Sequence, residues 1–265
     1  MGLIKKMEIC KLCGKEAILK MSHIIPRSYY KRLKKESGQL LLVSSTEEEP
    51  KLTNSDPKER LLCGDCEQFL SSNYEVYGTV IFRRSENVIK NDDHIVINGF
   101  DYKRTYLFFI SILWRASLST HPTFQAVSLD EGLQELLRQS IISNNLKISV
   151  HTNLRLDHFF RLSVVRIIDS TKNIEDEIIR SIITNFRIDH GTDKRSIIYY
   201  LMLDGFLVTY LLYIGKDLHD VRAKRFSSQL VSGSSAKINK VEIHELKEIA
   251  GMFNMIIEKS KNGGA

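Results

Sequence analysis

The residues best suited to chemistry in this chain are its four cysteines, which occur as two C-x-x-C pairs. Cys10 and Cys13 form the first pair, and Cys63 and Cys66 form the second. Two pairs of this spacing can direct four thiolates at one metal ion, as in structural zinc sites. The long connection between the pairs costs little, because loop-closure entropy grows slowly with length. The pattern predicts a zinc site with four cysteine ligands; the alternative is four unconnected buried cysteines.

A histidine between the two cysteine pairs is placed for chemistry. His23 follows Ser22, lies ten residues after Cys13 and precedes Pro26 by three residues. A zinc ion with four thiolate ligands has no open coordination position, so catalysis must lie elsewhere. Neutral imidazole accepts a proton from water near pH 7, and that water can attack a phosphodiester. The alternative is a core histidine bonded to a backbone carbonyl.

A hydrolase of this kind also needs a divalent cation beside the scissile phosphate. The acidic residues near the second cysteine pair are Asp56, Glu59, Asp65, Glu67 and Glu75. Glu67 directly follows the last cysteine and begins a predicted helix, so its carboxylate would be held rigidly. The structural alternatives are that Glu67 complements a helix dipole, that Asp56 is a turn residue before a proline, and that Glu75 is a surface charge.

The charge distribution favours a polyanionic partner. The formal net charge is +6 and the isoelectric point is about 9.0. The first 35 residues carry ten basic and two acidic residues, a local charge of +8. Within them Arg27, Lys31 and Arg32 follow His23 and are candidate phosphate contacts, although charge runs are often solvated surface. The first residues lack the apolar core of a secretory leader, so we expect a cytoplasmic protein with zinc rather than disulfides.

These motifs resemble the zinc-stapled branch of the HNH, or His-Me finger, endonucleases. The resemblance covers residues 7 to about 80 and rests on the first cysteine pair, the Ser22-His23-Ile24-Ile25-Pro26 segment and the second pair followed by Glu67. The segment from Ser111 to Ser119 is similar to the C-terminal half of uncharacterised bacterial HNH proteins.

The resemblance implies a ββα-metal fold with a structural zinc ion. His23 would be the general base, and a Mg²⁺ or Mn²⁺ ion would lie between the first strand and the helix. The sequence departs from the family at three positions. Ser22 replaces an Asp or His that ligates the metal, Lys58 replaces an Asn, and Glu67 replaces a His. Glu67 suits a hard cation, Asp56 is a second candidate ligand, and Lys58 is a candidate phosphate contact.

Hydrophobic periodicity and turn residues predict the elements of the chain. Predicted helices cover residues 28–37, 67–77, 102–118, 129–143, 174–185 and 241–259. Predicted strands cover residues 40–43, 146–150 and 159–168, and residues 87–94 are polar enough for a linker. Residues 197–214 are long and apolar enough for a membrane span. The turn residues Asp204 and Gly205 at their centre favour a buried β-hairpin instead, and we expect no membrane association.

The fold class is expected to be α+β, with two units. Residues 1–86 would form an HNH-like nuclease domain with structural zinc, and residues 95–265 an α+β domain for contacts with substrate, a partner protein or a second copy. The expected function is metal-dependent endonuclease cleavage of DNA, most simply duplex DNA; by analogy, it would serve defence against phage or plasmid DNA. Two other functions stay open: a zinc-stabilised nucleic-acid-binding module with a decayed metal site, and a protein-interaction subunit.

Overall fold

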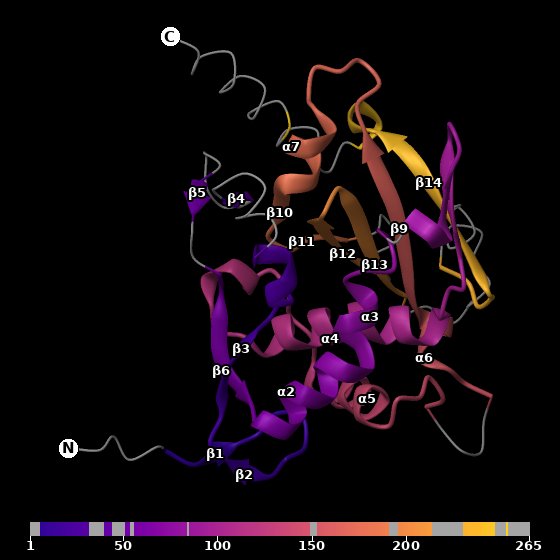
Figure 1. The fold of residues 1–265 in the computed structure, drawn as a ribbon. Coiled ribbons are helices and arrows are strands. Elements are labelled where there is room, and N and C mark those ends of the chain that lie inside the picture. The colour runs from indigo at the N-terminus through magenta and orange to yellow at the C-terminus, as the bar shows by residue number, and fades with distance from the viewer. Residues whose placement is uncertain are drawn as a thin grey trace.

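The computed structural model describes most of the chain as a mixed α and β protein, in agreement with the expected α+β class. The described residues are 6–31, 40–43, 51–53, 56–83, 85–148, 153–190, 196–213, 230–246 and 253. Figure 1 shows helices in the lower centre, a small stranded region at the N-terminal side and a large sheet above the helices. None of the helices within the described ranges has the length and hydrophobicity that crossing a membrane requires.

The N-terminal part contains two small antiparallel sheets and a helical segment. Strand β1 pairs with β2, and β3 pairs with β6. The strands are β1 (Glu8–Ile9), β2 (Glu16–Ala17), β3 (Lys20–His23) and β6 (Lys58–Leu62). The helical segment begins directly after β6 and consists of α2 (Gly64–Leu70), a π-helical turn (Ser71–Glu75) and α3 (Val76–Gly78). The predicted helix over residues 67–77 is thus confirmed and extended by three residues at its start.

Over the residues that the structure describes, the large sheet has ten strands, and its centre is a nearly continuous apolar hairpin. The strand order is β5-β4-β10-β12-β13-β9-β14-β8-β7, and β11 pairs with β12 beside β10. The strands are β4 (Leu40–Val43), β5 (Lys51–Thr53), β7 (Val88–Lys90), β8 (His94–Asn98), β9 (Phe160–Ile168), β10 (Ile182–Thr184), β11 (Arg187–His190), β12 (Ser196–Leu203), β13 (Phe206–Tyr213) and β14 (Ser235–Glu242). The predicted hairpin is confirmed, with Asp204 and Gly205 at positive φ angles of 55° and 74°, which a tight two-residue turn requires.

Helix α4 (Tyr102–Leu118) is the central element of the fold and has the bounds that the sequence predicts. The Asp101 side chain accepts a hydrogen bond from the Arg104 N–H group and so caps the helix. Two tyrosines fix the helix to the sheet. The Tyr106 hydroxyl donates to the Phe160 carbonyl, and the Tyr210 hydroxyl donates to the Phe109 carbonyl. Helix α4 therefore connects the sheet to the N-terminal elements (Figure 1).

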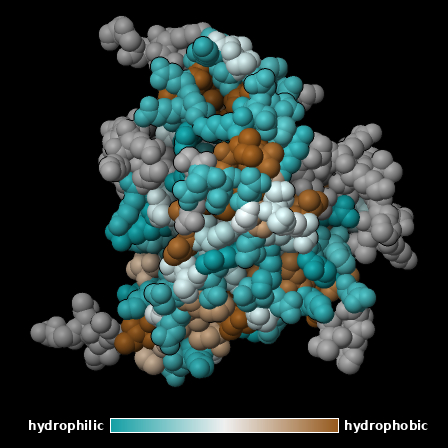
Figure 2. All heavy atoms as spheres, turned by 45° about the vertical axis from the view of Figure 1, so that its right-hand side comes forward, coloured by the Kyte–Doolittle hydropathy of each residue, from teal (hydrophilic) through white to brown (hydrophobic). Residues whose placement is uncertain are grey.

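Buried side chains cover both faces of the sheet centre. One cluster includes Tyr199 and Tyr210 on the α4 side, and it extends to Cys10 and Tyr74 in the N-terminal part. A second cluster on the other face contains Met202 and residues of helix α7 (Asp176–Ser181). Figure 2 shows one face of the molecule, where hydrophilic residues predominate and hydrophobic areas are small and separate. The predicted division into two units stays a prediction, although one apolar cluster includes residues of both.

Several remaining predictions are confirmed. The strand over residues 40–43 is β4, and the strand over 159–168 is β9. The helix over 129–143 is α5 (Glu131–Ile142), and a short helix, α6 (Leu156–Phe159), precedes β9. Residues 27–31 are helical, and the rest of the predicted helix over 28–37 lies outside the described residues.

Four predictions were wrong in whole or in part, and in three of them strand pairing overrides the local pattern. The predicted linker over 87–94 is the start of the β7–β8 hairpin. The helix predicted over 174–185 ends at residue 181, and its β-branched continuation is β10. The predicted strand over 146–150 has only one isolated bridge in its described part. The first two residues of the helix predicted over 241–259 belong to strand β14 instead, and most of the other residues of that prediction lie outside the described part.

Candidate metal and catalytic site

The four cysteines converge into one group that can hold a metal ion such as zinc. Their sulfur atoms all lie within 4.8 Å of one another, and the thiols of Cys13 and Cys63 are 3.9 Å apart. Zn–S bonds of about 2.3 Å in a tetrahedron separate two sulfurs by about 3.8 Å. The sulfur spacing and the all-thiolate donor set therefore fit zinc.

Backbone geometry on both sides positions the sulfurs. The first pair lies in the turn between β1 and β2, where Gly14 has a φ of 73° and donates to the Cys10 carbonyl at 2.9 Å. The second pair begins helix α2, with Cys63 at the N-cap and Cys66 in the first turn. The Lys11 N–H group donates to the Leu61 carbonyl at 3.0 Å, which joins the first turn to β6.

Backbone N–H groups also prepare one sulfur for metal binding. Burial by itself raises the pKa of the Cys10 thiol, but hydrogen bonds from the N–H groups of Cys13, Cys63 and Leu12 outweigh burial and lower the pKa to about 7. The Cys63 N–H contributes at 3.3 Å. Burial raises the pKa of Cys66. Cys10 is therefore prepared to supply a thiolate near neutral pH.

Two consecutive residues at the end of β3 each bind a carboxylate. The His23 Nε2 atom lies 2.7 Å from Oδ2 of Asp56, and the Ser22 hydroxyl donates to Oε1 of Glu67. The His23 and Asp56 side chains are 19% and 23% exposed, so solvent reaches both. Ser22 is fully buried against the first turn of α2. The end of β3 thus carries two separate hydrogen-bonded pairs, one of which joins the predicted base to Asp56 and the other of which joins Ser22 to Glu67.

Of the remaining predicted residues, Lys58 lies on the strand paired with β3, and Arg27 and Lys31 lie in the helical turn that follows β3. Lys58 lies directly opposite His23 in the antiparallel register and is exposed, so the two side chains share one face of the pair. Arg27 and Lys31 are exposed one helical turn apart. Arg32 lies outside the described residues. Lys58 is thus the predicted cation that the strand register places beside His23.

A tyrosine that the sequence did not single out lies beside the histidine. The rings of Tyr30 and His23 have centroids 6.4 Å apart. Burial raises the pKa of Tyr30, and the nearby Asp56 carboxylate raises it further, so the hydroxyl keeps its proton. That hydroxyl is buried and has no hydrogen-bond partner among the described residues. It is therefore a protonated donor next to the His23–Asp56 pair.

The sequence indicates that Arg115 in the apolar run has a partner, but not that this buried arginine holds the histidine backbone. Arg115 of α4 donates from Nη1 to the His23 carbonyl at 2.7 Å and forms an ion pair with Glu75 at 2.8 Å. Glu75 is therefore the partner of a buried cation, and not the simple surface charge that the sequence left open as an alternative. The available signal was a charged residue inside the apolar run of α4, since a buried charge requires a partner.

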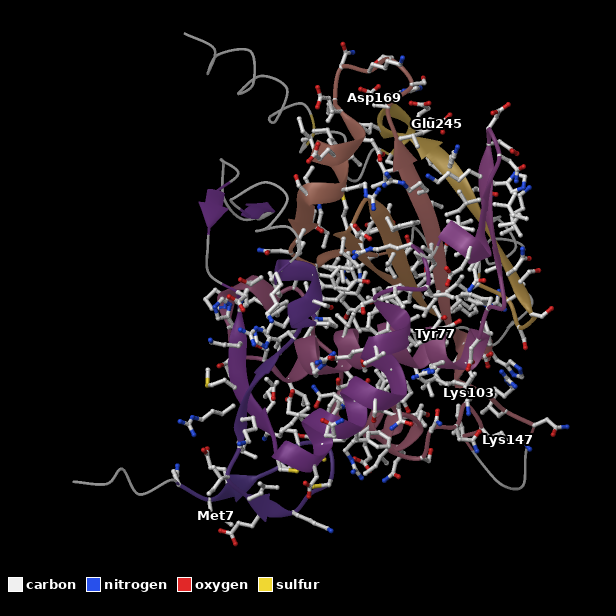
Figure 3. All side chains as sticks on the ribbon, viewed as in Figure 1. Met7, Tyr77, Lys103, Lys147, Asp169 and Glu245 are labelled. Carbon is white, nitrogen blue, oxygen red and sulfur yellow. The ribbon has the colours of Figure 1, made fainter. Side chains whose placement is uncertain are left out.

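The carboxylates near His23 do not form a second compact metal-binding group. Across the part of the chain that the structure describes, the cysteines are the only set of three or more Cys, His, Asp or Glu side chains that converge closely enough for a metal. In Figure 3, Met7 lies at the end of the molecule that carries the β1–β2 turn, whereas Asp169 and Glu245 lie at the opposite end.

Comparison of the chain with family models, curated proteins and solved structures gave no match in any of the three.

Proposed function

We propose that this chain is an HNH-type endonuclease of the ββα-metal fold that hydrolyses DNA phosphodiester bonds. The observation that carries the proposal is the pair of hydrogen bonds at the end of β3, from His23 to Asp56 and from Ser22 to Glu67. A strand pair followed at once by a helix, with the four-cysteine group at their junction, would keep these residues in place. The basic surface with Arg27 and Lys31 suits a phosphate backbone.

His23 would act as the general base through its second ring nitrogen. With Nε2 donating its proton to Asp56, Nδ1 has a free lone pair. Nδ1 would take a proton from water, and the resulting hydroxide would attack phosphorus. The bond from phosphorus to the leaving oxygen then breaks, and that oxygen takes up a proton from solvent. Asp56 would stabilise the imidazolium that forms.

The other residues at this end of the strand pair would act on the phosphate. Glu67, with the Ser22 hydroxyl or Asp56, would hold a Mg²⁺ or Mn²⁺ ion that neutralises the developing charge. A cation with only one or two protein carboxylates is typical of Mg²⁺ sites that also bind a substrate phosphate. Lys58 would contact the phosphate from the strand opposite His23. Protection against foreign DNA would be one use of such an activity.

Plasmid nicking tests the proposal. We expect the purified chain to convert supercoiled plasmid to nicked circles with Mg²⁺ or Mn²⁺, and not with EDTA. His23→Ala and Glu67→Gln should abolish nicking while keeping the zinc content. Matched controls are His190→Ala, an exposed histidine on β11, and Asp65→Asn, an exposed acid in the same turn as Glu67. Nicking that persists in His23→Ala would contradict the assigned base.

A second candidate function is a zinc-stabilised nucleic-acid-binding module without catalysis. The favouring observation is that no second metal-binding group converges among the described residues, and that Ser22, a weak ligand, faces Glu67. This function predicts salt-dependent DNA binding without cleavage in either metal. If affinity for duplex DNA does not fall as salt rises, the basic surface has another role, and a protein-interaction subunit becomes the better description.

A further inference from the structure

A cavity on the sheet side of the molecule gathers positive charge from five different segments. It has a volume of about 270 Å³ and lies between the β7–β8 hairpin, the central strands and helix α7. Its basic lining residues are Arg83, Lys90, Arg166, Arg180 and Lys240. None of these residues belongs to the cysteine group or has been assigned a role at His23, so ligand binding in this cavity does not depend on nuclease activity.

The carboxylates at the cavity do not balance this charge. Asp176 is the one acidic residue among the lining residues, and it bonds to Arg166. Asp204 approaches from the hairpin turn, 2.5 Å from Nε of Arg83 and 3.9 Å from Nε of Arg180. Within the described part of the chain, two carboxylates thus face five cations. An uncompensated group of cations in a partly enclosed space is costly unless an anion joins it.

Two of the arginines show the effect of this excess positive charge directly. Arg166 is 11% exposed, and burial lowers its pKa although Asp176 is adjacent. Arg83 uses Nε on Asp204, but its buried Nη2 has no hydrogen-bond partner among the described residues. The Arg83 guanidinium is therefore incompletely satisfied, and a bound anion such as phosphate would stabilise its charge.

The rest of the wall is aromatic and aliphatic, which narrows the class of ligand. Phe82 and Phe206 have ring centroids 5.1 Å apart, and the Arg166 guanidinium lies over the Phe206 ring at 5.3 Å. Val88 and Ile95 extend the apolar surface. A ligand that matches this wall has a flat or apolar part beside its charged groups. The cavity volume lies near the lower end of small-ligand sites, roughly 300–1,000 Å³, and does not suit a polymer.

We propose that this cavity binds a small phosphorylated ligand of the nucleotide class. The phosphates contact Arg83, Arg180 and the two lysines, and the base packs against the phenylalanine side. Arg83 also lies over the ring of Tyr29 at 5.3 Å, in the helical turn that follows His23. A ligand phosphate at Arg83 would therefore be linked, through the contact of Arg83 with Tyr29, to the segment that carries the candidate base.

Calorimetry and thermal unfolding of the full-length chain test the proposal with three probes: adenosine 5′-diphosphate, inorganic phosphate and adenosine. We expect the diphosphate to bind and to raise the unfolding temperature, and adenosine not to bind. The double variant Arg180→Gln/Lys90→Gln should weaken binding by about tenfold or more, as expected for the loss of charged contacts. Arg180 is 42% exposed and Lys90 is exposed, so both substitutions should leave the fold intact.

A matched control is Arg187→Gln, an exposed arginine on β11 that does not line the cavity, and it should bind like the wild type. Equal affinity for inorganic phosphate and the diphosphate would reduce the site to a simple anion site and overturn the nucleotide class. Binding that is unchanged in the double variant would overturn the location. If none of the probes binds, the proposal is wrong; an oligonucleotide that then loses affinity in the double variant would assign the surface to nucleic acid.

Discussion

Arg115 of helix α4 donates a hydrogen bond of 2.7 Å to the main-chain carbonyl of His23, and the same guanidinium forms an ion pair with Glu75. One buried cation thereby joins the central helix, the segment after α2 and the end of β3. The position of the candidate base depends on a residue that lies in the other predicted unit. This relationship has a direct consequence for stability.

We expect Arg115→Met to lower the free energy of unfolding by about 3–5 kcal/mol, since it leaves Glu75 without its partner in a largely buried site. Denaturant unfolding measures the loss. The matched control is Arg138→Met. Arg138 also donates to a main-chain carbonyl, of Leu12, and pairs with Glu135, but its side chain is 23% exposed rather than 2%. Its loss should cost about 1 kcal/mol or less. Equal losses would show that burial does not set the value of the Arg115 contacts.

Zinc should be present at one ion per chain and should stabilise the N-terminal part. Cys13→Ser is expected to reduce the bound zinc, measured by elemental analysis, and to lower the unfolding temperature. Because thiolates and not thiols bind zinc, retention should weaken as pH falls. Full stability in a chain stripped of metal would argue against a structural role for the cysteine group.

Gly78 marks a contact where no side chain fits. A Cβ atom placed there would lie 2.3 Å from the ring of Phe108 on α4. Gly78→Ala is therefore expected to destabilise the chain by about 1–3 kcal/mol, as overpacking does. Gly132→Ala in α5 is the control, because its Cβ would only approach the Asp130 carboxylate at 3.2 Å. Thermal unfolding should rank the two variants in that order, and the reverse order would mean that α3 and α4 are less closely packed.

Glu59 should make stability depend on pH in the acidic range. Burial raises the pKa of this carboxyl, but hydrogen bonds from Ser119 and Thr120 outweigh burial and lower the pKa below its ordinary value of 4.5. A lowered folded-state pKa means that the contribution is present above about pH 4.5 and is lost as pH falls through the folded pKa. The stability difference between wild type and Glu59→Gln should therefore shrink as pH falls below 4.5. Ser119→Ala should show the same trend with a smaller size. If the stability difference between wild type and Glu59→Gln did not change with pH, Glu59 would not be the cause of the pH dependence.

Local signals predicted the parts of the fold that depend on neighbours in sequence. The bounds of α4 follow from an apolar run behind the capping residue Asp101, and the cysteine group follows from paired spacing. The role of Arg115 was hidden because its acceptor is a main-chain carbonyl 92 residues away, which no side-chain pattern records. The helix expected over 174–185 was cut short because its last residues pair with β4 and β12, both distant in sequence. The basic cavity has no motif, since its cations come from five segments.

Strand β4 lies between the two cysteine pairs in sequence, yet it pairs in parallel with β10 near the far edge of the large sheet. A ribosome delivers β4 early and β10 only after most of the chain has been made. The segment between the cysteine pairs cannot complete its pairing until then, whereas the cysteines can bind metal as soon as Cys66 has emerged. Early metal capture would shorten the search for the late parallel pairing, because it fixes both ends of the waiting loop. On this view the zinc ion helps the nascent chain to order its assembly, and zinc-starved cells should accumulate the protein in aggregates rather than as an inactive soluble form.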